Sequence, residues 1–161
     1  MTAPVYVAVC GPGNATDEEG AWAEEIGRLL ARAGAVVVCG GLGGVMEAAA
    51  RGAKSEGGLS VGILPGWDRS EAAEELTIAL PTGIGEARNT LVVRAADAVI
   101  AISGEFGTLS EIALALKAGV PLVGLSTWEL HRKGKPVDAF PQAGTPEEAV
   151  QLALSLAAKR V

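Results

Sequence analysis

The chain has 161 residues, of which 49% are hydrophobic and 20% are charged, and its formal net charge is −6 at pH 7. This size and apolar content predict one domain over residues 1–161 that buries its core without disulfides. The negative balance argues against nucleic acid or an anionic membrane as a partner. Because no apolar run approaches the roughly 20 residues of a membrane span and Met1–Cys10 lacks a signal-peptide pattern, we expect a cytoplasmic protein.

Short apolar runs rich in β-branched residues alternate with helical patterns along the chain. In chain order, the patterns predict strand 5–9, helix 17–33, strand 35–39, helix 44–56, strands 59–64 and 76–80, helix 86–95, strand 98–102, helix 109–118, strand 121–124 and helix 146–160. Strands that are apolar throughout are typical of a sheet buried on both faces. We therefore expect a Rossmann-like α/β fold with a doubly wound parallel sheet of six or seven strands and helices on both faces.

Several of these boundaries carry their own signals. The capping-box pattern, a threonine followed three residues later by glutamate, occurs at Thr16 and Glu19, Thr108 and Glu111, and Thr145 and Glu148. Gly34 and Gly119 each follow a predicted helix, where a left-handed residue is common. The polar segments 65–75 and 126–141, broken by proline and glycine, are typical of lids, ligand loops or subunit contacts.

Three glycine-rich loops, at residues 10–14, 39–44 and 103–108, each lead from a predicted strand into a predicted helix. Such loops offer free amides and a helix N-terminus at the carboxyl edge of the sheet, where ligands of open α/β sheets bind. The same glycines can also serve only tight turns and close packing. The candidate phosphate-binding residues are Gly11, Gly13, Gly41, Gly43, Gly104, Gly107 and Thr108.

Other common sites are excluded by their spacing. The first loop lacks the third glycine of the dinucleotide fingerprint, and no G-x-x-x-x-G-K-[ST] sequence is present. His131 is the only histidine, so neither a serine triad nor a multi-histidine metal site can form, and we expect no metal. Cys10 and Cys39 lie in apolar segments and are predicted to be buried thiols.

The remaining candidates are charged or polar residues near the last two loops. Arg88 can fork onto a phosphate, and Asn89 beside it is a further candidate ligand- or phosphate-binding residue. Glu111 can act as a general base or stabilise a developing cation, but it can equally serve only its capping box. Spacing alone leaves both roles open. Ser103 and Glu105 lie within the third loop, and their part in binding is not fixed by the pattern.

Four motifs together resemble one known family. They are Gly40-Gly41-x-Gly43-Gly44-Val45-Met46, Gly85-Glu86-Ala87-Arg88-Asn89, Ala96-Asp97-Ala98-Val99-Ile100-Ala101 and Gly104-x-x-Gly107-Thr108-x-x-Glu111. Over roughly residues 5 to 125 the chain resembles the "lonely guy" (LOG) group, also called lysine decarboxylase-like. Its characterised members are cytokinin riboside 5′-monophosphate phosphoribohydrolases, and the molybdenum cofactor carrier protein is a close relative. A decarboxylase is rejected, because no lysine follows a strand to form the Schiff base with pyridoxal phosphate.

The resemblance implies that Arg88 and Glu111 are catalytic and that Gly104, Gly107 and Thr108 bind phosphate. It implies hydrolysis of the N-glycosidic bond of a nucleoside 5′-monophosphate, with no cofactor required. The bound ligand would be an AMP-like nucleotide, phosphate or molybdopterin. Relatives form dimers through helices flanking the site, so we expect a homodimer or higher oligomer, with Leu91–Val93 as a contact or as ordinary core.

The third loop departs from the family pattern P-G-G-x-G-T, because Ser103 and Glu105 replace its proline and second glycine. If that position needs a left-handed backbone, glutamate is strained by roughly 1–2 kcal/mol. Asn89 stands where the hydrolases usually have lysine, and this A-R-N form is closer to the cofactor carriers. Two hypotheses follow: a phosphoribohydrolase that uses Arg88 and Glu111, or a non-catalytic carrier of molybdopterin in the same cleft.

Overall fold

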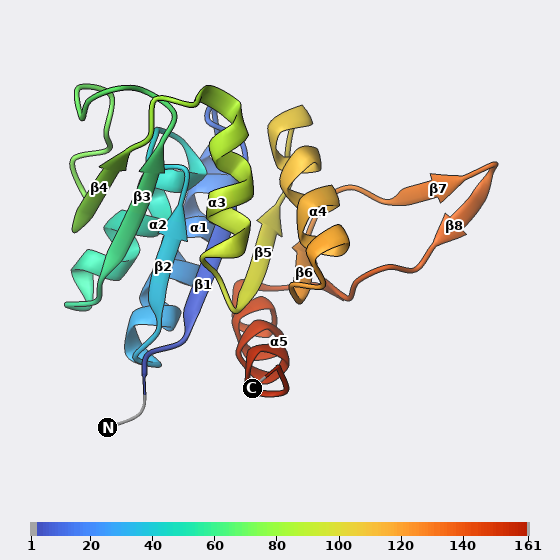
Figure 1. Ribbon diagram of the computed structural model, residues 1–161. Coiled ribbons are helices and arrows are strands. Elements are labelled where there is room, and N and C mark those ends of the chain that lie inside the picture. The colour runs from blue at the N-terminus through green and yellow to red at the C-terminus, as the bar shows by residue number, and fades with distance from the viewer. Residues whose placement is uncertain (1–2, 161) are drawn as a thin grey trace.

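The computed structural model describes residues 3–160 and contains one parallel sheet of seven strands (Figure 1). The strand order is β4-β3-β2-β1-β5-β6-β9, and every neighbouring pair is parallel. The strands are β1 (Tyr6–Cys10), β2 (Val36–Cys39), β3 (Ser60–Leu64), β4 (Ile78–Pro81), β5 (Ala98–Ile102), β6 (Leu122–Leu125) and β9 (Gln142–Ala143). The Rossmann-like α/β fold predicted from the sequence is confirmed.

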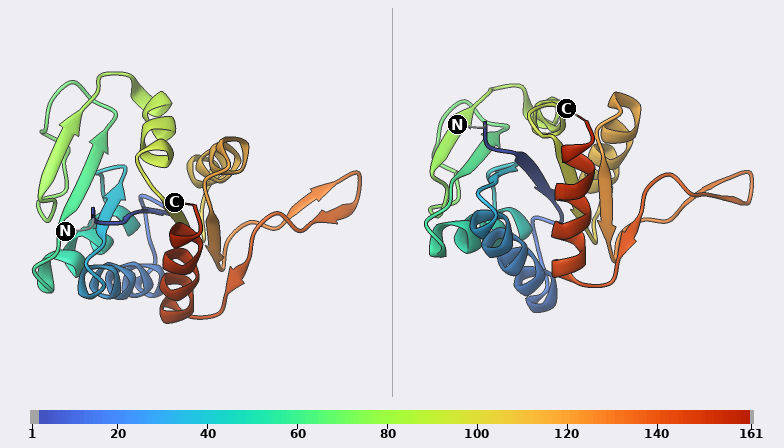
Figure 2. Two further views of the ribbon diagram at one scale, coloured as in Figure 1. Left: turned by 60° about the horizontal axis from the view of Figure 1, so that its bottom comes forward. Right: turned by 90° about the horizontal axis from the view of Figure 1, so that it is seen from below.

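Five α-helices cover the two faces of the sheet (Figure 2). Helices α1 (Asp17–Arg32), α2 (Val45–Ser55) and α5 (Pro146–Ala158) pack on one face against Val7, Val9 and Ile100. Helices α3 (Asn89–Arg94) and α4 (Phe106–Ala118) pack on the other face against Ala8 and Cys10. Because successive strand residues point to opposite faces, each apolar strand contributes side chains to the hydrophobic cores on both faces of the sheet.

The glycine- and alanine-rich composition allows α1 and α2 to pack closely. A Cβ atom at Gly27 would overlap the carbonyl oxygen of Ala49, and one at Gly52 would overlap that of Glu24. Each helix thus places a glycine against the backbone of the other. Larger residues at these two positions would force the helices apart.

The helix starts were predicted with mixed success. Thr16 and Glu19 form the predicted capping box of α1. The pairing of Thr108 with Glu111 was wrong: α4 begins at Phe106 with Glu105 as its N-cap, so Thr108 lies inside the first turn. The physical reason is the left-handed backbone of Ser103 (φ 46°) and Gly104 (φ 122°), which turns the chain into the helix directly after β5. At the other end, Gly119 is the predicted left-handed cap (φ 68°).

Two further segments differ from the prediction. The predicted helix 86–95 consists of a 3-10 turn, η1 (Gly85–Arg88), followed by the short helix α3. The segment 126–141, predicted to be irregular, contains an antiparallel hairpin of β7 (Leu130–Arg132) and β8 (Lys135–Val137) that projects from the domain (Figure 1). We call residues 130–137 the arm.

An apolar strip remains uncovered on the α3 side of the sheet edge. In the parallel register Val61 pairs with Ile78 and Ile63 with Leu80, so these side chains share the face that carries α3. Ile78 and Leu80 are exposed by 44% and 46%. Within the Leu91–Val93 segment only Leu91 is exposed, while its two neighbours are core residues. In the part of the chain that the structure describes, no helix has the length and hydropathy needed to cross a membrane.

Candidate functional site

A pocket of about 510 Å³ lies at the carboxyl edge of the sheet, where the strand order reverses between β1 and β5. Loops that leave neighbouring strands in opposite directions open a crevice at such a point. The lining comes from Pro12, Asn14, Thr16, Glu19 and the segments 103–105 and 126–128. The loops after β1, β5 and β6 and the start of α1 thus build one cavity.

Most of the lining residues are polar by type, and two of them are acidic. Hydroxyl and amide groups surround the carboxylates of Glu19 and Glu105, Trp128 supplies an aromatic wall, and no lysine, arginine or histidine is found among these lining residues. Glu19 is held in place because its Oε2 accepts a hydrogen bond from the Thr16 amide at 2.8 Å. The neighbouring Ser103 hydroxyl and this amide lower the pKa of Glu19, so it carries its charge at neutral pH.

Glu105 is an exposed pocket residue with an unstrained backbone. Its φ of −99° and ψ of −165° are extended, so the strain predicted for a left-handed glutamate does not occur. The left-handed residues are instead Ser103 and Gly104. A proline, which locks φ near −65°, could not adopt the conformation of Ser103. The carboxylate of Glu105 does not cap α4, and within residues 3–160 it forms no ion pair.

These carboxylates make the pocket a poor place for a phosphate. A phosphate charge about 4 Å from one carboxylate is disfavoured by about 4 kcal/mol at an effective dielectric of about 20. A helix N-terminus supplies at most about 2 kcal/mol in return. A phosphate group of a ligand is therefore disfavoured inside the pocket.

The first turn of α4 lies beside the pocket, directly after Glu105, and offers free amides. Its first amides have no acceptor within the helix, and no side chain caps them. A Cβ atom at Gly107 would meet nothing within 4 Å, so packing does not require glycine there and its surroundings are open. Thr108, by contrast, is buried, and its side chain packs under Gly104.

Arg88 is 8% exposed and points into the protein rather than into the pocket. Its guanidinium donates to the Gly40 carbonyl at 3.4 Å and to Oδ1 of Asn89, while its buried Nε has no partner among the described residues. Asn89 donates in turn to the Ser110 hydroxyl at 2.9 Å, and that hydroxyl donates to the Gly107 carbonyl at 2.6 Å. This network connects the β2 loop to the first turn of α4.

Glu111 is 7% exposed and also lies outside the pocket lining. Burial raises the pKa of Glu111 to about 7, although the adjacent Cys10 thiol and the charge of Arg88 both favour the ionised form. Burial likewise raises the pKa of Cys10, and it raises the pKa of Cys39 to about 11. Both cysteines are free and buried, as predicted.

The first two glycine loops pack against each other, and although Pro12 and Asn14 line the pocket, none of the glycines of these loops does. A Cβ atom at Gly11 would clash with Val45, and one at Gly41 would clash with Leu64, so packing explains both glycines. At Gly13 and Gly43 a Cβ atom would make only ordinary contacts, at 3.8 and 3.5 Å.

Only some of the residues predicted to form the ligand site line the pocket. Ser103, Gly104 and Glu105 line it, and Gly107 and Thr108 lie in the adjoining helix turn. No sequence pattern marks Glu19 or Trp128 as a pocket residue. The spacing from Thr16 predicts only a capping role for Glu19. Trp128 lies in the segment 126–141, whose polar, proline-broken composition predicts a lid, a ligand loop or a subunit contact.

Comparison with known proteins agrees with this architecture. The model of the SLOG cluster4 family matches residues 4–151. An uncharacterized protein of Archaeoglobus fulgidus is 40% identical over 158 residues, which cover 96% of this chain and 98% of that protein. The molybdenum cofactor binding protein of Rippkaea orientalis is 36% identical, with a TM-score of 0.87 over 97% of this chain and 99% of that one. The molybdenum cofactor carrier protein of Chlamydomonas reinhardtii is 30% identical, with a TM-score of 0.83 over 96% and 99% of the two chains. The resemblance to the LOG-like proteins near the cofactor carriers is thereby confirmed, and the chain belongs to the SLOG cluster4 family.

Proposed function

We propose that this protein binds the molybdenum cofactor, or a related phosphorylated pterin, and releases it unchanged. The observation that carries the proposal is the pocket at the switch point, which is open to a ligand while Arg88 and Glu111 lie outside its lining. Support comes from two relatives similar over nearly their whole length, whose names describe binding or carrying of this cofactor.

The residues present fit such a ligand. In our proposal the pterin ring lies in the pocket against Trp128, since stacking on an aromatic side chain contributes about 1–3 kcal/mol. The phosphate lies at the free amides of the first turn of α4, near Gly107 and outside the pocket lining. We propose that Arg88 and Asn89 act on the ligand indirectly, because their network with Ser110 holds this turn.

Cofactor binding can be tested with a charge placed at the proposed phosphate position. Gly107→Glu adds a carboxylate where the structure has open space, and an acidic residue in a first turn is favourable for the helix. We expect the dissociation constant for the cofactor, measured by equilibrium dialysis with molybdenum quantified by mass spectrometry, to rise at least about tenfold.

Ala113→Glu is the matched control, since it adds the same charge to an exposed position of the same helix, nearly two turns later. It should bind the cofactor as the wild type does. If the wild type fails to bind the cofactor, or if Gly107→Glu binds it unchanged, the proposal is refuted.

A phosphoribohydrolase is the second candidate, because one observation favours it. The pKa of about 7 at Glu111 suits a general base at neutral pH. Against this activity, the Glu111 carboxylate is buried and the guanidinium of Arg88 already bonds to Gly40 and Asn89. Incubation with AMP, followed by chromatography of free adenine, distinguishes the two candidate functions. Adenine release by the wild type that is lost in Glu111→Ala supports the hydrolase. Release at the background level by both proteins excludes it.

A further inference from the structure

We infer that the carboxylate of Glu105 selects a ligand with the amino, ring N–H and oxo edge shared by pterin (2-amino-4-oxo) and guanine (2-amino-6-oxo), and that the pocket discriminates against adenine. The inference rests on the proposed function, which it deepens by naming the residue that reads the ring. Glu105 stands where the P-G-G-x-G-T pattern has its second glycine, so that pattern does not account for the carboxylate.

Of the two carboxylates that line the pocket, only that of Glu105 has no hydrogen-bond partner among the described residues. The other carboxylate, Glu19, is already bonded to the Thr16 amide and lies next to the Ser103 hydroxyl. Glu105 is exposed, does not cap α4 and has no ion-pair partner among residues 3–160. Both of its oxygens can therefore accept hydrogen bonds from a ligand.

The chemistry of the ring edge decides which ligand fits. The edge shared by pterin and guanine presents a ring N–H beside an amino N–H, and these two parallel donors match the two oxygens of a carboxylate, as the guanidinium fork does. Adenine presents an amino group beside an unprotonated ring nitrogen, whose lone pair would face one carboxylate oxygen. Hypoxanthine keeps the ring N–H but lacks the amino group, so it offers one donor instead of two.

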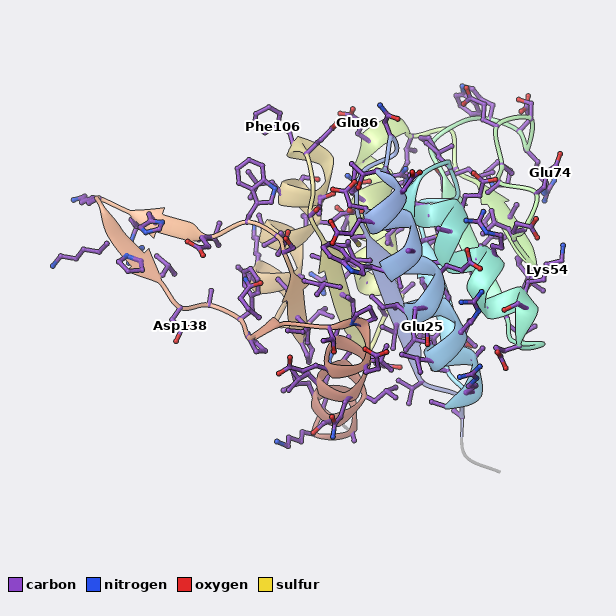
Figure 3. The ribbon with its side chains drawn as sticks, turned by 180° about the vertical axis from the view of Figure 1, so that it is seen from behind. Glu25, Lys54, Glu74, Glu86, Phe106 and Asp138 are labelled. Atoms are coloured by element: carbon purple, nitrogen blue, oxygen red, sulfur yellow. The ribbon has the colours of Figure 1, made fainter. Side chains whose placement is uncertain are left out.

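An aromatic pair beside Glu105 can stack against a flat ligand ring without recognising the hydrogen-bonding groups on the edge of that ring. Trp128 lines the pocket, and the ring of Phe106 lies 6.0 Å from it, centre to centre, at an angle of 32°. Phe106 is 80% exposed and projects from the start of α4 (Figure 3). Ring stacking depends little on which base is bound, so selection falls to the carboxylate.

Backbone strain is also concentrated at this pocket. Three residues other than glycine have a left-handed backbone within residues 3–160, and two of them, Ser103 and Ser126, line the pocket. The third, Lys133, lies in the turn of the arm. Such conformations persist where surrounding structure enforces them, and they cluster at ligand sites.

Three nucleotides that differ only in the base edge test the inference, since their common ribose phosphate cancels in the comparison. Isothermal titration should show GMP binding at least about tenfold more tightly than AMP, with IMP between them. Glu105→Gln replaces one acceptor oxygen by a donor of the same shape. It should bring the affinities for GMP and AMP within about twofold of each other, mainly by weakening GMP.

Two control variants separate edge recognition from charge and stacking. Glu18→Gln removes the same charge from an exposed position of α1 outside the pocket lining, and it should keep the preference for GMP. Phe106→Ala should weaken all three nucleotides by a similar factor and leave their ratios unchanged, because stacking does not read the edge.

The outcomes distinguish this inference from the proposed function. A wild type with no preference for GMP, or a Glu105→Gln variant that retains the preference, overturns the inference. If the preference depends on Glu105 but the molybdenum cofactor does not bind, the pocket is a site for guanine-type ligands and the proposed function fails alone. If the cofactor binds equally to the wild type and to Glu105→Gln, the proposed function stands and the inference fails.

Discussion

Replacing Glu111 with glutamine should flatten the pH dependence of stability between about pH 5 and 8. Burial raises the pKa of this carboxyl from 4.5 to about 7 in the folded protein, and unfolding returns it to water. Between these two values the folded state keeps a proton that the unfolded state has lost, so the stability from Glu111 is full below pH 4.5 and is lost as the pH rises through 7. The difference between the two pKa values corresponds to about 3 kcal/mol of folding stability, at roughly 1.4 kcal/mol for each pKa unit.

Urea unfolding of the wild type and of Glu111→Gln, measured at several pH values, checks this number. The difference between the two curves isolates Glu111, because the acidic groups with lowered pKa, such as Glu19 and Asp68, titrate below this range in both states. The Cys10 thiol stays protonated throughout. The wild type should lose about 3 kcal/mol more than the variant from pH 5 to 8. Parallel curves would show that the Glu111 carboxyl is hydrated in the folded protein, contrary to its burial.

Three further predictions concern packing, the thiols and assembly. Gly52→Ala should lower the free energy of unfolding by about 1–3 kcal/mol, because the added Cβ atom would overlap the backbone of α1. Gly20→Ala is the control, since its Cβ atom would meet open space and should not destabilise the protein. Equal melting temperatures of the two variants would contradict this prediction. Cys10 and Cys39 should resist Ellman's reagent in the native protein and react once urea unfolds it, and fast native labelling would contradict their burial. We propose that the uncovered strip on β4 joins copies of the chain, so Leu80→Glu should convert an oligomer to a monomer in light scattering; a wild type that is itself monomeric would refute this.

Much of the fold could be predicted because its signals are local. Continuous apolar runs such as Ala98–Ile102 indicate strands buried on both faces, and Thr16 with Glu19 marks a helix start. The start of α4 could not be found in this way. It depends on the left-handed backbone conformation of Ser103. This conformation is rare for residues other than glycine, and no sequence signal predicts it here. Strand β9 has only two residues and forms because β6 offers it a free edge.

The site was harder to predict because residue spacing does not give the direction of a side chain. The motif predicted that Arg88 faces a ligand, but its guanidinium turns inward to Gly40 and Asn89. Glu105 could be identified as a departure from the family pattern, although its place in the pocket could not. Trp128 reaches the pocket only because β6 lies beside β5, which is a property of the strand order.

The arm interrupts the chain between two strands that are already neighbours. Gly124 of β6 pairs with Gln142 of β9, so the sheet closes across the base of the arm, and β7 and β8 bond to each other. Helix α5, which follows, is anchored in the core with α1 and β5. A protease that cuts at the exposed basic tip, Arg132–Lys135, would therefore leave two fragments that remain associated. The same geometry makes the tip a suitable position for inserting a label or an affinity tag.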